Sequence, residues 1–159
     1  MEQKAKNILL LSGATLGVLL VISSNKKKIK NMLSPVIARI SSPFGKRKAT
    51  GSSPEEFHNG VDLAVPIGTP IKASANGEIL HVYKNERGGL QLTAKLENGF
   101  IVGYAHLSKT IFKDGEKFSK GDILALSGTS GHSTGPHLHF TLKDAKGTPL
   151  NPQDYFSFA

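Results

Sequence analysis

From Ile40 onward, short runs of apolar or alternating residues are separated by turn signals, and no long helical period occurs. Alternation with a period of two is typical of strands that bury one face, and Asn-Gly or Asp-Gly between two such runs is typical of a hairpin. Seven segments are predicted to be strands: Gly60–Val65, Pro70–Ala73, Gly77–Lys84, Leu90–Leu96, Phe100–Leu107, Ile123–Ser127 and His137–Leu142. The pattern therefore predicts an all-β fold with an antiparallel sheet and little helix.

The N-terminal segment has a different pattern, because Ile8–Ile22 is apolar on every side and has lysines before and after it. As a helix it would be about 22 Å long, which reaches across a bilayer only if flanking residues extend it and the lysines snorkel. We predict one hydrophobic helix in residues 1–30. It is either a retained membrane anchor, favoured by Lys26–Lys28 directly after it, or a signal peptide. Residues 26–38 read as a basic linker, and residues 31–159 as the folded domain.

The net charge of +8 is unevenly distributed along the chain. Residues 1–30 contain six lysines and one glutamate, so the N-terminal segment holds most of the excess. The rest is mildly basic and shows neither a basic stripe nor a nucleic-acid-binding motif, so no nucleic-acid partner is expected. The absence of cysteine excludes disulfides and thiolate zinc sites.

His58 and Asp62 are the first candidate site residues. In the predicted strand 60–65, Val61, Leu63 and Val65 would face the core, and Asp62 would face the other way, on the same side as His58. An imidazole nitrogen and a carboxylate oxygen on one face form a donor pair that Zn²⁺ accepts.

His137 and His139 are the second pair. Apolar and polar residues alternate from His137 to Leu142, so in a strand both histidines lie on the polar face. Helical geometry would instead point residues two apart in nearly opposite directions. A third predicted strand places Tyr104 and His106 together on one face.

The other two histidines are interpreted more simply. His81 has no histidine or carboxylate at matching spacing in its strand, and His132 belongs to the loop 127–136. We interpret His81 as a solvated or otherwise satisfied residue, and His132 as a loop residue near the site rather than a ligand.

Three motifs together resemble those of a known family: His58-x-x-x-Asp62, Tyr104-Ala-His106-Leu107 and Ser133-Thr-Gly-Pro-His137-Leu-His139-Phe140. They are similar to the signature of the lysostaphin-like, LytM-type zinc endopeptidases, peptidase family M23. The segment Ser42-Pro-Phe-Gly-Lys-Arg47 resembles the entry segment of that family. The likeness covers about residues 38–156, in order.

The resemblance implies roles for the site residues. His58, Asp62 and His139 would bind Zn²⁺, and His106 and His137 would be catalytic histidines that are not ligands. Tyr104 and Thr134 are candidates to line the substrate groove. The implied fold is an antiparallel sheet with an open groove, and the implied substrates are peptide cross-links or stem peptides of bacterial peptidoglycan.

The resemblance also leaves alternatives open. The domain could bind peptidoglycan or activate another hydrolase without catalysis, or be a structural protein in which the metal only holds the fold. The lysines that follow residues 8–22 favour the cytoplasmic side, whereas a wall enzyme acts outside. Three settings remain open. The protein could be a membrane-anchored or secreted enzyme of the cell envelope, an endolysin that waits inside the cell, or a component of a membrane-containing virion. The oligomeric state is not predicted.

Overall fold

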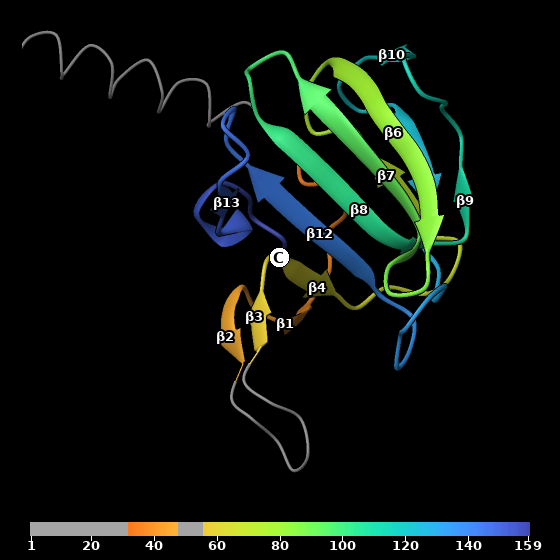
Figure 1. Cartoon of the computed structure of the whole chain (residues 1–159), viewed down its shortest axis with the longest axis vertical. Helices are drawn as coiled ribbons and strands as arrows, with labels where there is room; N and C mark the ends of the chain where they lie inside the picture. The colour runs from red at the N-terminus through yellow and green to blue at the C-terminus, as the bar shows by residue number, and fades with distance from the viewer. Residues whose placement is uncertain (1–31, 48–55) are drawn as a thin grey trace, which may run out of the picture. The chain divides into compact units, whose positions relative to one another are not determined.

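The structure, a computed structural model, describes residues 32–47 and 56–159. Within these residues, eight strands form one sheet in the order β1-β4-β12-β8-β7-β6-β10, with β13 paired to β12 (Figure 1). The pairings along this path are antiparallel. The strands are β1 (Ile40–Ser42), β4 (Val61–Leu63), β6 (Gly77–Asn85), β7 (Gly89–Leu96), β8 (Ile101–Leu107), β10 (Lys117–Phe118), β12 (Leu138–Lys143) and β13 (Pro149–Leu150).

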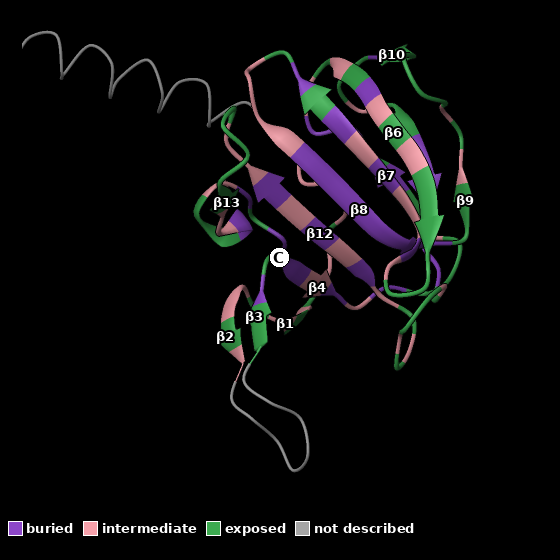
Figure 2. Cartoon of the chain, in the orientation of Figure 1, coloured by how far each residue is buried: buried purple, intermediate pink, exposed green. Residues whose placement is uncertain are grey.

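Two smaller sheets complete the described fold. One has the order β5-β11-β9 and the other is the β2–β3 hairpin. Their strands are β2 (Gly45–Arg47), β3 (Glu56–His58), β5 (Pro70–Lys72), β9 (Lys109–Thr110) and β11 (Ile123–Leu126). Ile71 of β5 and Leu124 of β11 belong to the same buried cluster as Leu92 and Phe140 of the large sheet, so the core lies between the two sheets. Figure 2 shows how buried and partly exposed positions alternate along β12.

The seven predicted strands are all present, and their ends differ from the prediction by at most two residues. The Asn-Gly at 98–99 forms the turn between β7 and β8, with Gly99 at φ +94°. The strands that the pattern does not predict have two or three residues each, too few to show an alternation. A 3₁₀ turn at Pro152–Asp154 is the only helical element of the described residues. The all-β prediction is confirmed.

The predicted basic linker is corrected in its described part. Met32, Val36 and Ala38 pack against the core, Lys72 N–H donates to the carbonyl of Pro35, and Ala38 N–H to that of Phe158. These apolar residues are too irregularly spaced to predict a strand, but they cover one edge of the core. Residues 32–38 therefore belong to the folded domain.

The predicted N-terminal helix and the division at residue 30 fall in or next to residues 1–31, which are outside the described residues. Within residues 32–47 and 56–159, no helix has the length and apolarity that a membrane span requires.

Candidate metal centre and active-site cleft

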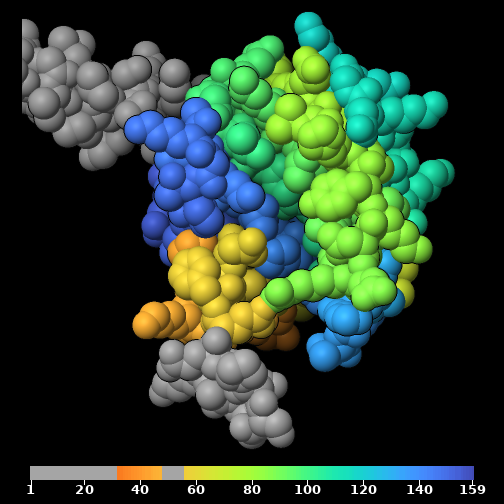
Figure 3. Space-filling view, in the orientation of Figure 1, coloured from red at the N-terminus to blue at the C-terminus, as the bar shows by residue number. Residues whose placement is uncertain are grey.

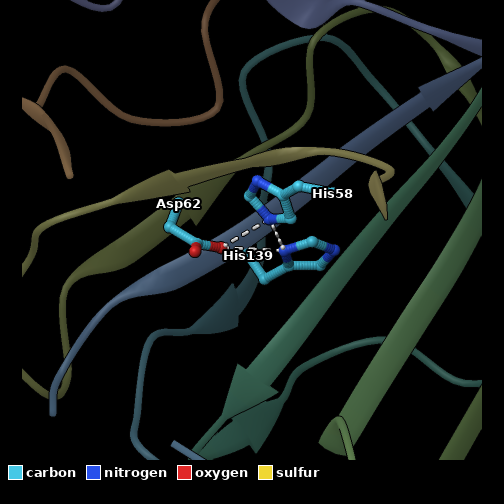
Figure 4. A group of neighbouring side chains, drawn as sticks. All are labelled: His58, Asp62 and His139. Carbon is cyan, nitrogen blue, oxygen red and sulfur yellow. Dashed lines mark hydrogen bonds and ion pairs between the residues drawn. The ribbon is translucent and has the colours of Figure 1, made fainter. Parts of the chain in front are cut away.

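Three strands bring His58, Asp62 and His139 together (Figure 4). His58 is the last residue of β3, Asp62 is the middle residue of β4 and His139 is the second residue of β12. The antiparallel pairing of β4 with β12 sets Asp62 directly opposite His139. Residues separated by 77 positions in the chain thus become cross-strand neighbours on the face that points away from the core.

The donor atoms of the three side chains converge. Asp62 Oδ1 lies 2.8 Å from His139 Nδ1 and 3.2 Å from His58 Nε2, and the two ring nitrogens are 3.0 Å apart. His58 is 6% exposed, whereas Asp62 and His139 are partly exposed. The cluster is therefore closed on the His58 side and reachable from solvent on the His139 side.

Each of the three residues has a second partner that orients it. His58 Nδ1–H donates to the carbonyl of Pro43 over 2.7 Å, and His139 Nε2–H donates to Asn59 Oδ1 over 3.2 Å. Arg47 Nη2 holds the other carboxylate oxygen, Asp62 Oδ2, at 2.8 Å. Such partners fix the tautomer and the direction of metal ligands in proteins.

These tautomers decide what the centre can hold. With protons on His58 Nδ1 and His139 Nε2, the lone pairs of His58 Nε2 and His139 Nδ1 point at each other and at Asp62 Oδ1. Three acceptors that face one another repel unless a cation or a proton lies among them. Two imidazole nitrogens and one carboxylate oxygen are donors that fit Zn²⁺, and three protein ligands leave a coordination position open for chemistry.

The charge state of Asp62 agrees with this role. Burial of the carboxyl acts to raise its pKa, but hydrogen bonds with His139 and His58 and their positive charge outweigh burial, so the pKa of Asp62 falls well below its usual range. Asp62 is therefore an ionised carboxylate, the form in which it can bind a metal ion.

Two further histidines lie beside the centre. His106 and His137 have ring centroids 4.6 Å apart, and His137 Nε2 is 3.8 Å from Asp62 Oδ1. His106 Nδ1–H donates to the carbonyl of Ser130 over 2.7 Å, and His137 Nδ1–H to that of Gly135 over 2.8 Å. Both rings thus keep Nε2 free of backbone partners. Burial is the main cause that lowers the pKa of His106 and favours its neutral form.

His106 reaches this position through a β-bulge, which corrects the expectation that Tyr104 shares its face. In the β7–β8 pairing, Tyr104 is opposite Leu92 but Leu107 is opposite Leu90, so β8 has one extra residue. His106 has φ +59°, a left-handed conformation that is uncommon outside glycine. Bulges of this kind re-aim side chains near active sites.

Tyr104 consequently lies in the core and not in the groove. It is 2% exposed and stacks at 5.4 Å on Phe140, and burial raises the pKa of its hydroxyl. The alternation of β8 before the bulge places Tyr104 with Val102, which is fully buried.

The site residues line one open cleft with a volume of about 1060 Å³. Thr134, predicted to line the groove, does so, and His132 lines it as well. The predicted solvated histidine, His81, is 72% exposed and lies 3.7 Å from Asp114 at the surface. The lining residues are Arg47, Glu56, Phe57, His58, Asn59, Asp62, Asn85, Glu86, Arg87, Gly88, Gln91, His106, His132, Ser133, Thr134, His137 and His139.

Two lining residues that contact the predicted ligands, Arg47 and Asn59, were not singled out from the sequence. Arg47 ends a segment that carries the family resemblance, so its position was a usable signal. Nothing in the sequence distinguishes Asn59 from other asparagines. Its contact with His139 becomes visible only in the folded structure.

Comparison with known proteins agrees with the fold and the site. The model of the family described as "Peptidase family M23" matches residues 56–152. The chain belongs to this family. The predicted resemblance is confirmed, and the matched region contains all five of the predicted metal-binding and catalytic residues.

Individual members of the family are similar to this chain in sequence and in structure. The peptidoglycan DD-endopeptidase ShyA of Vibrio cholerae is 39% identical over 114 residues, which is 71% of this chain and 26% of ShyA. The chain thus spans about a quarter of the length of that relative. A zinc-containing peptidase from Vibrio cholerae superposes with a TM-score of 0.69 at 31% identity, covering 76% of this chain and 39% of that one.

The catalytic domain of the antimicrobial peptidase lysostaphin from Staphylococcus simulans has a TM-score of 0.66 at 29% identity. That alignment covers 81% of this chain and 95% of the lysostaphin domain. The antiparallel sheet with an open cleft is therefore the fold of this family.

Proposed function

We propose that this chain is a zinc-dependent endopeptidase that hydrolyses peptide bonds in bacterial peptidoglycan. The observation that carries the proposal is the convergence of three ligand atoms with two non-ligand histidines in one cleft. Structural zinc sites are almost always closed by four protein ligands, whereas catalytic sites have three and keep one position open. A cleft with three ligands and two further titratable rings is suited to hydrolysis.

The residues divide the chemistry among them. His58, Asp62 and His139 would hold Zn²⁺, which when bound supplies an activated water molecule and polarises the scissile carbonyl. His106 and His137 have Nε2 directed away from their backbone partners, so each can accept a proton, donate one or stabilise negative charge on the substrate. Their rings are close enough to act on the same reacting group.

The substrate class rests on the relatives. ShyA is named for peptidoglycan DD-endopeptidase activity and matches 71% of this chain. The cleft is open and many of its lining side chains are polar, which suits a peptide chain with many carbonyl and amide groups. Thr134 on the cleft wall is proposed as a substrate contact.

The test is hydrolysis of purified peptidoglycan by residues 31–159 loaded with zinc, followed by the appearance of new amino groups. We expect amino groups to be released by the wild type and not by His139→Ala. Zinc binding at one equivalent without release from any type of wall would contradict the proposal and favour a non-catalytic wall-binding domain.

The cell envelope is the proposed site of action, because its substrate is there. The anchor in residues 8–22, the alternative of a signal peptide, and an endolysin or virion setting stay predictions. Mass spectrometry of the protein purified from its own cell or particle would show whether residues 1–25 are retained, as an anchor requires.

A further inference from the structure

An ion pair crosses the mouth of the cleft. Arg87 Nη2 contacts Glu56 Oε1, and both residues line the cleft. Arg87 belongs to the turn between β6 and β7, whereas Glu56 begins β3. The two walls come from parts of the chain that share no strand pairing. Figure 3 shows atoms of the β6–β7 region reaching those of the β2–β3 region across the front of the molecule.

The backbone of Arg87 is fixed next to the proposed catalytic residues. The carbonyl of Gly88 accepts from His106 N–H at 2.8 Å, and the carbonyl of Arg87 accepts from His132 N–H at 3.0 Å. Gly131 has φ +75°, and a Cβ there would lie 2.2 Å from Gly89 N. The turn is therefore packed tightly onto the loop that carries Ser130, so the backbone of Arg87 is held in place while its side chain is exposed.

The charged residues of the cleft leave Arg87 as the positive side chain that can exchange its carboxylate partner. Of the described residues that line the cleft, only Arg47 and Arg87 carry a permanent positive charge. Arg47 is bound to Asp62 at 2.8 Å. The Arg87 side chain is 81% exposed and that of Glu56 is 46% exposed. Exposed ion pairs of this kind contribute little to stability, so another carboxylate can replace Glu56 at small cost.

We propose that Arg87 is a specificity residue that releases Glu56 and binds a free carboxylate of the substrate peptide. The proposal rests on the function proposed above and adds the substrate class: peptides with a free carboxylate close to the scissile bond. Guanidinium binds carboxylates through two parallel hydrogen bonds, which also fixes the direction of the peptide in the cleft. Glu56 then acts as an internal competitor that occupies Arg87 when no substrate is bound.

The experiment uses two synthetic cross-linked peptides that differ at one group, a free carboxylate in one and its amide in the other. KM and kcat are measured with both for the zinc-loaded wild type, Arg87→Gln and Glu56→Gln. We expect the wild type to have a KM roughly tenfold lower for the carboxylate peptide, the size of a charge-assisted hydrogen bond. Arg87→Gln should lose this preference, so that its KM values for the two peptides become similar. Glu56→Gln should lower KM for the carboxylate peptide alone.

Lys84→Gln is the matched control, because it removes one nearby positive charge from a residue outside the cleft lining. Its preference should equal that of the wild type. Arg87→Lys should keep part of the preference, since a point charge attracts carboxylate without the paired geometry. Equal KM values for the two peptides in the wild type, or a preference that survives in Arg87→Gln, would overturn the proposal.

Failure of the enzyme function is separable from failure of this proposal. If the wild type cleaves neither peptide, calorimetric titration of the same two peptides into the zinc-loaded protein replaces the kinetics. Tighter binding of the carboxylate peptide, lost in Arg87→Gln, would still support Arg87 as its binding group. Equal binding of both peptides would contradict it.

Discussion

The two faces of β12 carry opposite kinds of chemistry on one strand. Leu138, Phe140 and Leu142 are fully buried between the sheets. Residues on the other face are partly exposed, and His139 on that face contacts Asp62. One face supplies the apolar area that holds the sheet, and the other supplies groups that would be expensive to bury.

The difference teaches how a small sheet supports a metal centre. The core face fixes the strand register, and the register of β4 against β12 then sets Asp62 opposite His139. Substitutions on the cleft face are expected to change zinc binding or catalysis and to leave the fold intact. Substitutions on the core face are expected to lower the free energy of unfolding instead. The following predictions test that separation, from the largest expected effect to the smallest.

Asp62→Ala is expected to give the largest effect on activity. It removes a charged ligand, so bound zinc should be lost, and with it several kcal/mol of transition-state stabilisation, about 1,000-fold or more in rate. Circular dichroism should show an intact sheet. Asp154→Ala, an exposed carboxylate far from the cleft lining, is the control and should keep its zinc. A zinc-loaded Asp62→Ala would contradict the ligand assignment.

His137→Ala tests the non-ligand histidines. Zinc content measured by mass spectrometry should stay at one equivalent, while kcat falls by about 10² to 10⁴, the usual range for loss of a general acid or base. His81→Ala, a surface histidine, should behave as the wild type. Full activity in His137→Ala would remove this residue from the mechanism.

Leu142→Ala tests the core face of the same strand. The side chain is fully buried, so the free energy of unfolding should fall by about 2–5 kcal/mol, measured by urea denaturation of the zinc-free protein. Lys143→Ala, the next residue and on the other face, should change it by no more than about 0.5 kcal/mol. Equal losses in the free energy of unfolding would show that the two faces of β12 contribute equally to stability and would contradict the separation.

Asn59→Ala is expected to give the smallest effect. It removes the acceptor that orients His139 through Nε2–H, and zinc affinity should fall by about tenfold, measured by competition with a chelator. Asn59→Asp keeps an acceptor oxygen for His139 Nε2–H. Its zinc affinity should therefore be about tenfold higher than that of Asn59→Ala. Unchanged affinity in Asn59→Ala would show that β12 alone orients the ring.

Much of the fold followed from local pattern. The period-two alternation in β4 and β12 predicted which residues face the core, because pleating alone places neighbours on opposite faces. The two- and three-residue strands could not be predicted in this way, and neither could the packing of residues 32–38. The conformation of these segments depends on contacts with residues distant in the sequence.

For the candidate site, the sequence by itself determined the residue types and the cleft-facing positions of Asp62 in β4 and His139 in β12. His58 belongs to a separate strand, β3, so its approach to Asp62 does not follow from alternation along one strand. Tertiary structure alone decided the rest. The β-bulge at His106 turned that side chain into the cleft and left Tyr104 in the core, because one extra residue in β8 reverses the alternation. The contacts of Arg47, Asn59 and Arg87 likewise arise only when separate strands meet. Local pattern is set by pleating, but partners across the cleft are set by register and packing.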